Sequence, residues 1–348
     1  MLYSLDTDER EAMVKRCVDK KRQGKVVIPE SFLHQGIVYE VTRIGNFAFL
    51  DCRHLSVITI PKSVTSIRSK GFSFCRSLLF ITIPEGVTSI GDNAFSGCSS
   101  LTTVTIPENS QLTSIGESAF WKCESLESIN IPKSVTSIGE YAFWWCESLE
   151  SINIPKSVTS IGEGAFSSCS SLTAIIVDEG NKVYDSREKC NAIIETNSNT
   201  LIQGCSTTII PESVTSIGNF AFDGCNCLTN ITIPKGLTSI GDNAFFGCSN
   251  LTSIIIPKSV TSIGEKAFKN SDITYLTILG TPAIEKEAFY RCTQLTDVYC
   301  YPKETLPAED AFGELDLSLI TLHVPECAME AYKNTEPWSW FGKIVAIK

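Results

Sequence analysis

Catalysis or metal binding by this chain would have to start from its three histidines, His34, His54 and His323. A general base or a metal site needs several such groups close together in space. His34 and His54 lie near the start of the sequence and His323 near its end, and no Cys-x-x-Cys pair supports zinc binding. The serines and threonines are many, but they recur in a repeated pattern without a base partner. We therefore expect no catalytic residue, no metal, no cofactor, and three solvated histidines.

Most of the fifteen cysteines recur at a fixed interval, which indicates one structural position and not a set of disulfides. A small, soft apolar side chain once per repeat is typical of core packing. Ser271 stands at the same position of a later repeat, so we expect the position to require a small residue and not a thiol as such. The cysteines of this core ladder are Cys52, Cys75, Cys98, Cys123, Cys146, Cys169, Cys225 and Cys248.

The interval of 23 residues belongs to a longer repeated unit. Residues 124–140, ESLESINIPKSVTSIGE, recur letter for letter at residues 147–163. The interval from Pro107 to Pro132 is 25 residues instead of 23, because the segment ENSQLTSIG is two residues longer. A period of about 20 to 50 residues predicts stacked repeats, each of which buries its apolar face only against its neighbours.

Each repeat is predicted to begin with a short strand. In residues 149–154, Leu149, Ile152 and Ile154 are apolar and polar residues lie between them, a pattern that indicates a strand with one buried face. Pro155 follows, lacks an N–H and therefore ends the strand. Parallel pairing of this strand from repeat to repeat predicts the main sheet of a β-rich solenoid.

A second apolar segment and a turn complete the repeat. Val158 and Ile161 predict a short second strand, and Gly162 permits the turn that follows. We expect the Ala-Phe pair and the cysteine to fold inward on a short helical turn. The equivalent phenylalanines of successive repeats should then stack, and they are Phe49, Phe95, Phe120, Phe143, Phe166, Phe222, Phe245 and Phe268.

Both ends of the solenoid are predicted to be capped, because an open end exposes core and unpaired backbone. In the N-terminal cap the pattern of residues 13–18 suits a short helix or a strand. From Lys25 it predicts a hairpin, with a strand, a turn at residues 34–36 and a second strand. The predicted domains are the cap 1–43, repeats 44–177, an enlarged repeat 178–209, repeats 210–325 and the C-terminal cap 326–348.

The enlarged repeat interrupts the period. Its segments NAII and TLIQ flank the turn TNSN, which predicts a β-hairpin that projects from the stack. If Glu195 opposes Thr200 in this hairpin, then Cys190 opposes Cys205, and opposed residues can approach disulfide geometry. The sequence allows either a disulfide between Cys190 and Cys205 or two free thiols.

The repeat I-x-I-P-x-S-V-T-S-I-G-x-x-A-F-x-x-C resembles the BspA-like leucine-rich repeat, a 23-residue class of bacterial surface proteins. The insert and the ending TLHVPECAMEAYKNTEPWSWFGKIVAIK also resemble segments that recur in that family. The resemblance implies a curved right-handed superhelix with a main parallel sheet, in which residues 328–333 form a short helix and residues 338–340 close the last repeat. It also implies secretion or surface attachment, adhesion in some members, and no catalytic residues.

Composition narrows the partners and the location. The formal charge of −10 and a pI near 5.0 argue against nucleic acid and anionic membranes as partners. No apolar run is long enough to span a bilayer, and the charged start MLYSLDTDERE is unlike the apolar core of a signal peptide. We expect a monomer at the cell surface or secreted, from the resemblance, with the cytoplasm as the alternative.

The outward positions of the main sheet are the first candidate binding surface. They carry mostly Thr, Ser and Asn, which suits a merely solvated sheet face as well. Aromatic residues at Phe80, Tyr275 and Tyr299 interrupt this pattern and could anchor a partner.

A second candidate surface lies off the sheet. Trp121 and Trp144 occupy the same position in successive repeats, with Tyr141 and Trp145 beside them. This cluster either contacts a protein or a sugar ring, or covers a groove between repeats. We predict a non-enzymatic module that binds a protein or glycan ligand. The alternative is an intracellular interaction scaffold, and a carbohydrate-active enzyme is the least favoured.

Overall fold

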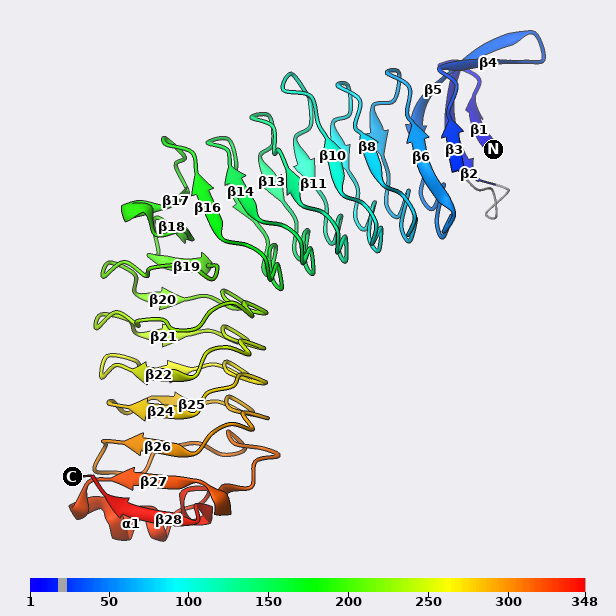
Figure 1. The fold of residues 1–348 in the computed structure, drawn as a ribbon. Coiled ribbons are helices and arrows are strands. Elements are labelled where there is room, and N and C mark those ends of the chain that lie inside the picture. The colour runs from blue at the N-terminus through cyan, green and yellow to red at the C-terminus, as the bar shows by residue number, and fades with distance from the viewer. Residues whose placement is uncertain (18–23, 348) are drawn as a thin grey trace. The chain divides into compact units, whose positions relative to one another are not determined.

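The computed structural model describes residues 1–17 and 24–347, which form stacks of short β-strands with little helix (Figure 1). The chain divides into two compact units, Met1–Leu172 with Val177–Val183, and Thr173–Ile176 with Tyr184–Lys348. In each unit most repeats add one strand to a main sheet and one to a second sheet. The prediction of a β-rich solenoid built from stacked repeats is confirmed.

The main sheet of the first unit consists of β3 (Gly24–Val27), β6 (Leu55–Thr59), β8 (Phe80–Thr82), β10 (Thr103–Thr105) and β12 (Ser128–Ile129), and β14 (Ser151–Ile154) follows in the next repeat. The strands are parallel and in register, so that Val57 lies opposite Phe80, and Phe80 opposite Thr103. Alternate residues such as Ile81 and Val104 are buried. This alternation is what the period-2 pattern predicts.

The second sheet of the first unit consists of β1 (Leu2–Asp6), β2 (Glu11–Arg16), β4 (Ser31–His34), β5 (Ile37–Ile44), β7 (Ser66–Ile67), β9 (Ser89–Ile90), β11 (Ser114–Ile115), β13 (Ser137–Ile138) and β15 (Ser160–Ile161). β2 pairs with β5, so residues 13–16 form a strand and not a helix; Val18 lies outside the described residues. β4 and β5 form an antiparallel hairpin. Its turn residues Gln35 and Gly36 have φ of 52° and 81°, which suits the twist of a tight hairpin.

The Ala-Phe segment of each repeat is a series of reverse turns and not a helical turn. Two residues per repeat have positive φ, for example Asn93 at 56° and Gly97 at 71°. The main chain is bonded to the next repeat: the N–H of Phe72 donates to the carbonyl of Ala94 at 2.7 Å. These bonds form a third ladder, which satisfies backbone groups that would otherwise be buried without partners.

Phenylalanine rings stack through the core of each unit. In the first unit the ring centroids are 5.0 to 5.3 Å apart and the planes differ by 9° or less. The stacked residues are Phe49, Phe72, Phe95, Phe120, Phe143 and Phe166 in the first unit, and Phe222, Phe245, Phe268, Phe289 and Phe312 in the second. Phe72, Phe289 and Phe312 extend the ladder beyond the residues that we predicted.

The main sheet of the second unit is parallel and consists of β22 (Ser253–Ile256), β24 (Tyr275–Ile278), β26 (Asp297–Cys300), β27 (Thr321–Val324) and β28 (Lys343–Ala346). β16 (Ala174–Val177) lies where the chain passes between the units. The second sheet runs in the order β17 (Tyr184–Asp185), β18 (Ile193–Glu195), β19 (Thr200–Gln203), β20 (Ser216–Ile217), β21 (Ser239–Ile240), β23 (Ser262–Ile263) and β25 (Ala283–Ile284).

Short helices occur at the insert and at the C-terminal end. They are η1 (Arg187–Lys189), η2 (Leu317–Leu319), η3 (Glu326–Ala328), α1 (Met329–Lys333) and η4 (Trp338–Trp340). Trp338 is fully buried and its indole N–H donates to the carbonyl of Leu306 at 2.9 Å, whereas Trp340 is 55% exposed. Of the two tryptophans expected to close the last repeat, only Trp338 does so.

The inserted hairpin is part of the second sheet and does not project from the stack. β18 and β19 pair antiparallel with Glu195 opposite Thr200, the register that the sequence predicts. β19 then pairs in parallel with β20, and Ile194 and Leu201 are fully buried. The prediction of a projecting hairpin was wrong because its apolar side chains join the core.

Candidate functional site

The ladder cysteines are buried thiols that donate hydrogen bonds to main-chain carbonyls. The Sγ of Cys98 lies 3.2 Å from the carbonyl oxygen of Phe72, one repeat earlier. Burial raises the pKa of the Cys98 thiol to about 12, so the group stays protonated and unreactive. Ser271, at the same position, instead donates its hydroxyl to the carbonyl of Phe268 in its own repeat, at 2.6 Å. The same thiol contact is made by Cys75, Cys123, Cys146, Cys169 and Cys248.

Cys52 and Cys225 are buried as well, the latter with its Sγ 3.9 Å from the carbonyl of Gly204. In most repeats this position thus holds a small side chain that carries a hydrogen-bond donor, S–H or O–H. The thiol contacts link neighbouring repeats to one another, and the buried thiols offer no nucleophile to a substrate.

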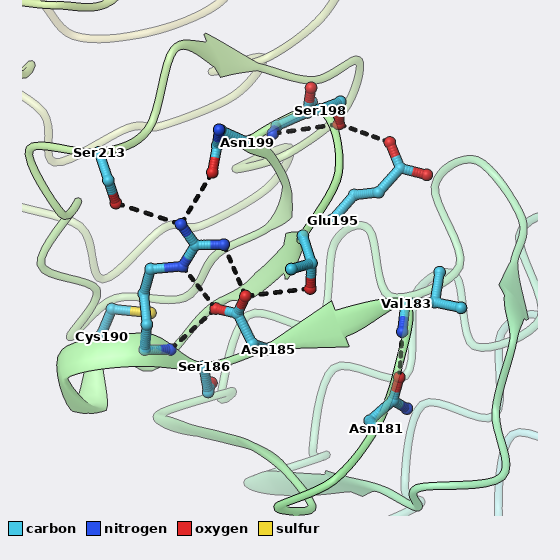
Figure 2. Close-up of polar contacts among 12 residues, drawn as sticks. Asn181, Val183, Asp185, Ser186, Cys190, Glu195, Ser198, Asn199 and Ser213 are labelled. Atoms are coloured by element: carbon cyan, nitrogen blue, oxygen red, sulfur yellow. Dashed lines mark hydrogen bonds and ion pairs between the residues drawn. The ribbon is translucent and has the colours of Figure 1, made fainter.

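The insert is held together by an ion pair that the sequence did not lead us to predict. Arg187 donates hydrogen bonds to Asp185, Asn199 and Ser213, and these three partners are labelled in Figure 2. The guanidinium donates from Nε and a terminal nitrogen to the two carboxylate oxygens of Asp185, at 2.7 and 2.6 Å. It also donates to Oδ1 of Asn199 at 2.8 Å, so it joins η1 to the hairpin turn. Partial burial raises the pKa of Asp185, but bonds from Arg187 and Thr196 outweigh it and hold that pKa below the usual value.

Cys190 and Cys205 are both free thiols. The predicted opposition fails because the register shifts between Ile193 and Ile194, so that Ile193 lies opposite Gln203. Cys190 precedes β18 and follows η1, and its Sγ lies 3.9 Å from the carbonyl of Ala192, while that of Cys205 contacts the carbonyl of Asn191. The possible disulfide is therefore not formed in this structure.

The four aromatic residues of the off-sheet cluster pack on one another and are half-buried. The rings of Trp144 and Trp145 are 5.1 Å apart, and those of Tyr141 and Trp144 are 5.2 Å apart. The ammonium of Lys122 lies 4.0 Å from the ring centroid of Trp145 and 5.0 Å from that of Trp121, both within cation–π range. The indole nitrogens of Trp121 and Trp144 are buried without a hydrogen-bond partner.

Two residues of this cluster occupy the left-handed backbone positions of their repeat. Tyr141 and Trp145 have φ of 53° and 61°, a conformation that bulky residues rarely adopt. The next repeat has glycine beside Tyr141: a Cβ at Gly164 would lie 2.6 Å from Cε1 of the tyrosine ring. The cluster thus combines strained backbone, unpaired indole N–H groups and close packing, and its role in ligand binding stays a prediction.

On the second unit, two predicted aromatic residues lie on the outward face of the main sheet together with a histidine and an aspartate. Tyr275 is 50% exposed and lies opposite Asp297 on β26. Tyr299 lies opposite His323 on β27, and their rings stack at 4.2 Å with planes 8° apart. Nε2 of His323 lies 2.8 Å from Oδ1 of Asp297.

We had expected His323 to be a solvated side chain, and this prediction was wrong. The pairing of β26 with β27 brings His323 diagonally across from Asp297. Partial burial raises the pKa of Asp297, but hydrogen bonds from His323 and Thr296 outweigh it, and the pKa lies below the usual value. We call Tyr275, Asp297, Tyr299 and His323 the aromatic–carboxylate cluster. It combines flat apolar rings with a carboxylate and an imidazole, which can bind a ligand by stacking and hydrogen bonding.

Phe80 lies in a hollow of about 680 Å³ over the main sheet of the first unit. Its side chain is 48% exposed on β8, opposite Val57. The wall is formed by the loops that follow β6, β8 and β10, including the two-residue extension after Pro107. The lining includes Lys25, Val57, Lys62, Phe80, Glu85 and Gln111, and we call this site the Phe80 hollow.

Among residues 1–17 and 24–347, no group of three or more His, Cys, Asp or Glu side chains is arranged to hold a metal ion. Within the same residues, α1 is the one α-helix, and no helix has the length and apolar character needed to cross a membrane.

The sequence matches the family model of the BspA type leucine rich repeat region, in six copies, over residues 35–146, 102–214 and 215–336. No curated protein matches the sequence.

Several solved structures are similar to this chain. The crystal structure of a leucine-rich cell surface protein from Faecalibacterium prausnitzii A2-165 is 28% identical, with a TM-score of 0.68 over 99% of this chain and 93% of that one. A leucine-rich repeat protein from Eubacterium ventriosum ATCC 27560 is 24% identical, with a TM-score of 0.65 over 97% and 89%. The pneumococcal vaccine antigen PcpA is 19% identical, with a TM-score of 0.64 over 99% and 96%. The last two similarities concern the fold alone.

Proposed function

We propose that this chain, which belongs to the family of BspA-type leucine-rich repeat proteins, is a non-enzymatic recognition module of the bacterial surface that binds a protein or a glycan. The family suggests a binding role, because a solenoid presents aligned side chains over a long surface. A 28% identical structure is that of a cell surface protein, which supports the location. Adhesion to host molecules is the process that this combination favours.

The observation that carries the proposal is the aromatic–carboxylate cluster. The core does not require these side chains, since they stand on the outward face where neighbouring repeats have residues such as Ser253. Tyr275 exposes half of its surface, and Asp297 lies opposite it on the next strand. The carboxylate of Asp297 contacts His323, whose ring stacks on that of Tyr299. Exposed aromatic rings with a few polar groups are typical of hot spots in binding surfaces.

The test is a screen of the full chain against host extracellular matrix proteins and a glycan array. We expect at least one specific ligand, whose binding is weakened by Tyr275→Ser and by Asp297→Asn. Leu319→Ser is the matched control, because Leu319 is also an exposed apolar residue of the second unit but belongs to η2 and not to a strand of the main sheet. Absence of any ligand, or binding that ignores both cluster variants, would contradict the proposal.

A second candidate function is an intracellular interaction scaffold. One observation favours it: none of the fifteen cysteines, all of which lie among the described residues, forms a disulfide, and thirteen of them are buried. Proteins of reducing compartments keep their thiols free, whereas secreted proteins often oxidise them. Cell fractionation with an antibody against this chain separates the two candidates, because the first requires the protein in the surface or secreted fraction.

A further inference from the structure

We propose that the Phe80 hollow binds an extended peptide segment of a partner protein, one that carries a carboxylate next to an apolar side chain. The proposal rests on the recognition function above and names the ligand class of one site on the first unit. Three features of the hollow support the proposal. Its walls arise where the repeat is interrupted, its floor is an exposed aromatic ring, and its charged side chains are unevenly distributed.

The walls exist because the sequence departs from its repeat at this place. In the usual repeat Pro61 is followed three residues later by the buried Val64, whereas Leu112 fills that buried position five residues after Pro107. The two extra residues raise the loop beside the sheet, and the N–H of Gln111 donates to the carbonyl of Glu85 at 2.9 Å. This bond fixes the longer loop against the preceding one.

A missing side chain widens the site. The position of Gly86 holds serine in other repeats, for example Ser63, whose hydroxyl donates to the carbonyl of Val41 at 2.7 Å. A Cβ at Gly86 would meet no atom closer than 4.0 Å, so the space beside the main chain is open. The longer loop and the glycine occur in neighbouring repeats, which places the hollow at one point of the solenoid.

The floor of the hollow is apolar where the sheet face is otherwise polar. Phe80 stands opposite Val57 on one side and Thr103 on the other, and Thr103 stands opposite Ser128. The ring exposes 48% of its surface although a threonine or serine suffices at the same position of the next repeats. An exposed ring in a concave site gains free energy when an apolar side chain of a partner covers it.

Charge specifies the other half of the ligand. Lys25 lies on β3, opposite Val57, and Lys62 follows β6, and neither forms an ion pair with a described residue. Glu85 belongs to the next repeat, after β8. The charge of the lining side chains therefore changes from positive on the β3 side to negative on the β8 side. Two lysines at one end of a hollow, in a chain of formal charge −10, favour a ligand with a carboxylate at that end.

A peptide fits these features better than a sugar. Sugar rings carry hydroxyl groups on most sides and need several convergent polar partners, whereas the floor of this hollow is the exposed ring of Phe80 beside Val57. A peptide supplies an apolar side chain and a carboxylate at adjacent residues. That carboxylate can belong to Asp or Glu or to a chain terminus, and the experiment separates these sources.

The experiment uses a phage-displayed random peptide library selected on the full chain. Enriched peptides are synthesised and their binding is titrated by fluorescence anisotropy. We expect them to combine an aromatic or branched apolar residue with a neighbouring acidic group. Each peptide is also made with Asp or Glu replaced by its amide, and with an amidated C-terminus, and the replacement that abolishes binding identifies the carboxylate.

Two variants address the site itself. Phe80→Ser and Lys62→Glu are each expected to weaken peptide binding roughly tenfold or more, as for hot-spot residues. Lys156→Glu is the matched control, because Lys156 has the same I-P-K-S-V context, is exposed and lies outside the hollow. It should leave binding unchanged. Replacement of the acidic residue of the peptide by lysine should restore binding to Lys62→Glu.

Failure to enrich any peptide, equal binding to Phe80→Ser, or an equal loss in Lys156→Glu would overturn the proposal. Circular dichroism and the melting temperature check that the variants are folded. If Phe80→Ser does not fold, Lys62→Glu still tests the proposal. A matrix or glycan ligand that needs Tyr275 but not Phe80 would leave the proposed function standing while this inference falls. If peptides bind through Phe80 but the screen of matrix proteins and glycans yields no ligand, this inference stands and the proposed function falls.

Discussion

The thiol of Cys98 donates to the carbonyl oxygen of Phe72 over a distance of 3.2 Å, and the same carbonyl accepts the N–H of Cys75 at 3.2 Å. One oxygen thus joins the turn of its own repeat to the core of the next. The contact recurs along both units, so the stack is held together by a thiol ladder as well as by backbone ladders. This arrangement explains why the position takes cysteine in most repeats.

The first prediction concerns the donor at this position. Cys98→Ala removes both the sulfur and the hydrogen bond, and we expect a loss of about 1–3 kcal/mol in the free energy of unfolding. Cys98→Ser should lose less, because a hydroxyl at this position can still donate to a main-chain carbonyl, as that of Ser271 donates to Phe268 of its own repeat. Urea denaturation measures both. The reverse variant Ser271→Cys should be tolerated, and a serine variant no better than alanine would contradict the donor role.

The second prediction concerns alkaline pH. Burial raises the pKa of Cys98 to about 12 and that of Cys292 to about 11, against about 8.5 for an unfolded thiol. Between these values the unfolded chain has lost the proton and the native chain retains it. The free energy of unfolding should therefore be constant below about pH 8.5 and fall above it, by about 1.4 kcal/mol per pH unit for each such thiol. Denaturation across this range measures the slope, which should be smaller in Cys98→Ala.

Thiol alkylation of the native protein is the control for this prediction. Only Cys227 and Cys327 are exposed among the cysteines, so mass spectrometry should find these two modified and the others protected. Rapid labelling of the ladder cysteines near neutral pH would show that the thiols are accessible, and the alkaline loss would then have another cause.

The third prediction concerns Trp121 and Trp144. Because both indoles are half-buried and packed, we expect the double replacement Trp121→Ser and Trp144→Ser to cost roughly 2–4 kcal/mol, less what is regained by removing two unpaired N–H groups. The melting temperature reports this directly. Trp340→Ser, at a 55% exposed tryptophan, should have little effect. A nearly unchanged melting temperature in the double variant would instead favour the cluster as a contact site.

The fourth prediction concerns the clamp of the insert. Arg187→Ala leaves the half-buried carboxylate of Asp185 with Thr196 as its remaining side-chain partner, and we expect a loss of about 1–2 kcal/mol near neutral pH. The pKa of Asp185 is lowered in the folded chain, so its contribution is present above the unfolded value of about 3.9 and is lost as pH falls through the folded value. Acid denaturation should therefore be less steep in the variant than in the parent.

A charge-preserving control accompanies the arginine variant. Arg187→Lys keeps the positive charge but cannot form two parallel bonds to the carboxylate, so it should be intermediate in stability. Full stability in Arg187→Ala would mean that the insert is held by its buried residues, such as Ile194 and Leu201, and not by the clamp.

The sequence determined the repeated part of this protein, because each equivalent side chain packs against its own copy one repeat away. The alternation at Ile152 and Ile154 placed the strands, and the recurrence of Phe and Cys placed the core. The turn TNSN set the pairing of Glu195 with Thr200. These features depend on local pattern and period, which a linear sequence carries.

Only the tertiary structure decided the contacts that do not repeat. The pairing of Asp297 with His323 depends on the register of β26 and β27, where Tyr299 and His323 are 24 and not 23 residues apart. The one-residue shift at Ile193 separates Cys190 from its expected partner. The Phe80 hollow needs the longer loop of one repeat to meet the sheet face of another. Register and loop geometry are set by packing between repeats, and no local pattern encodes them.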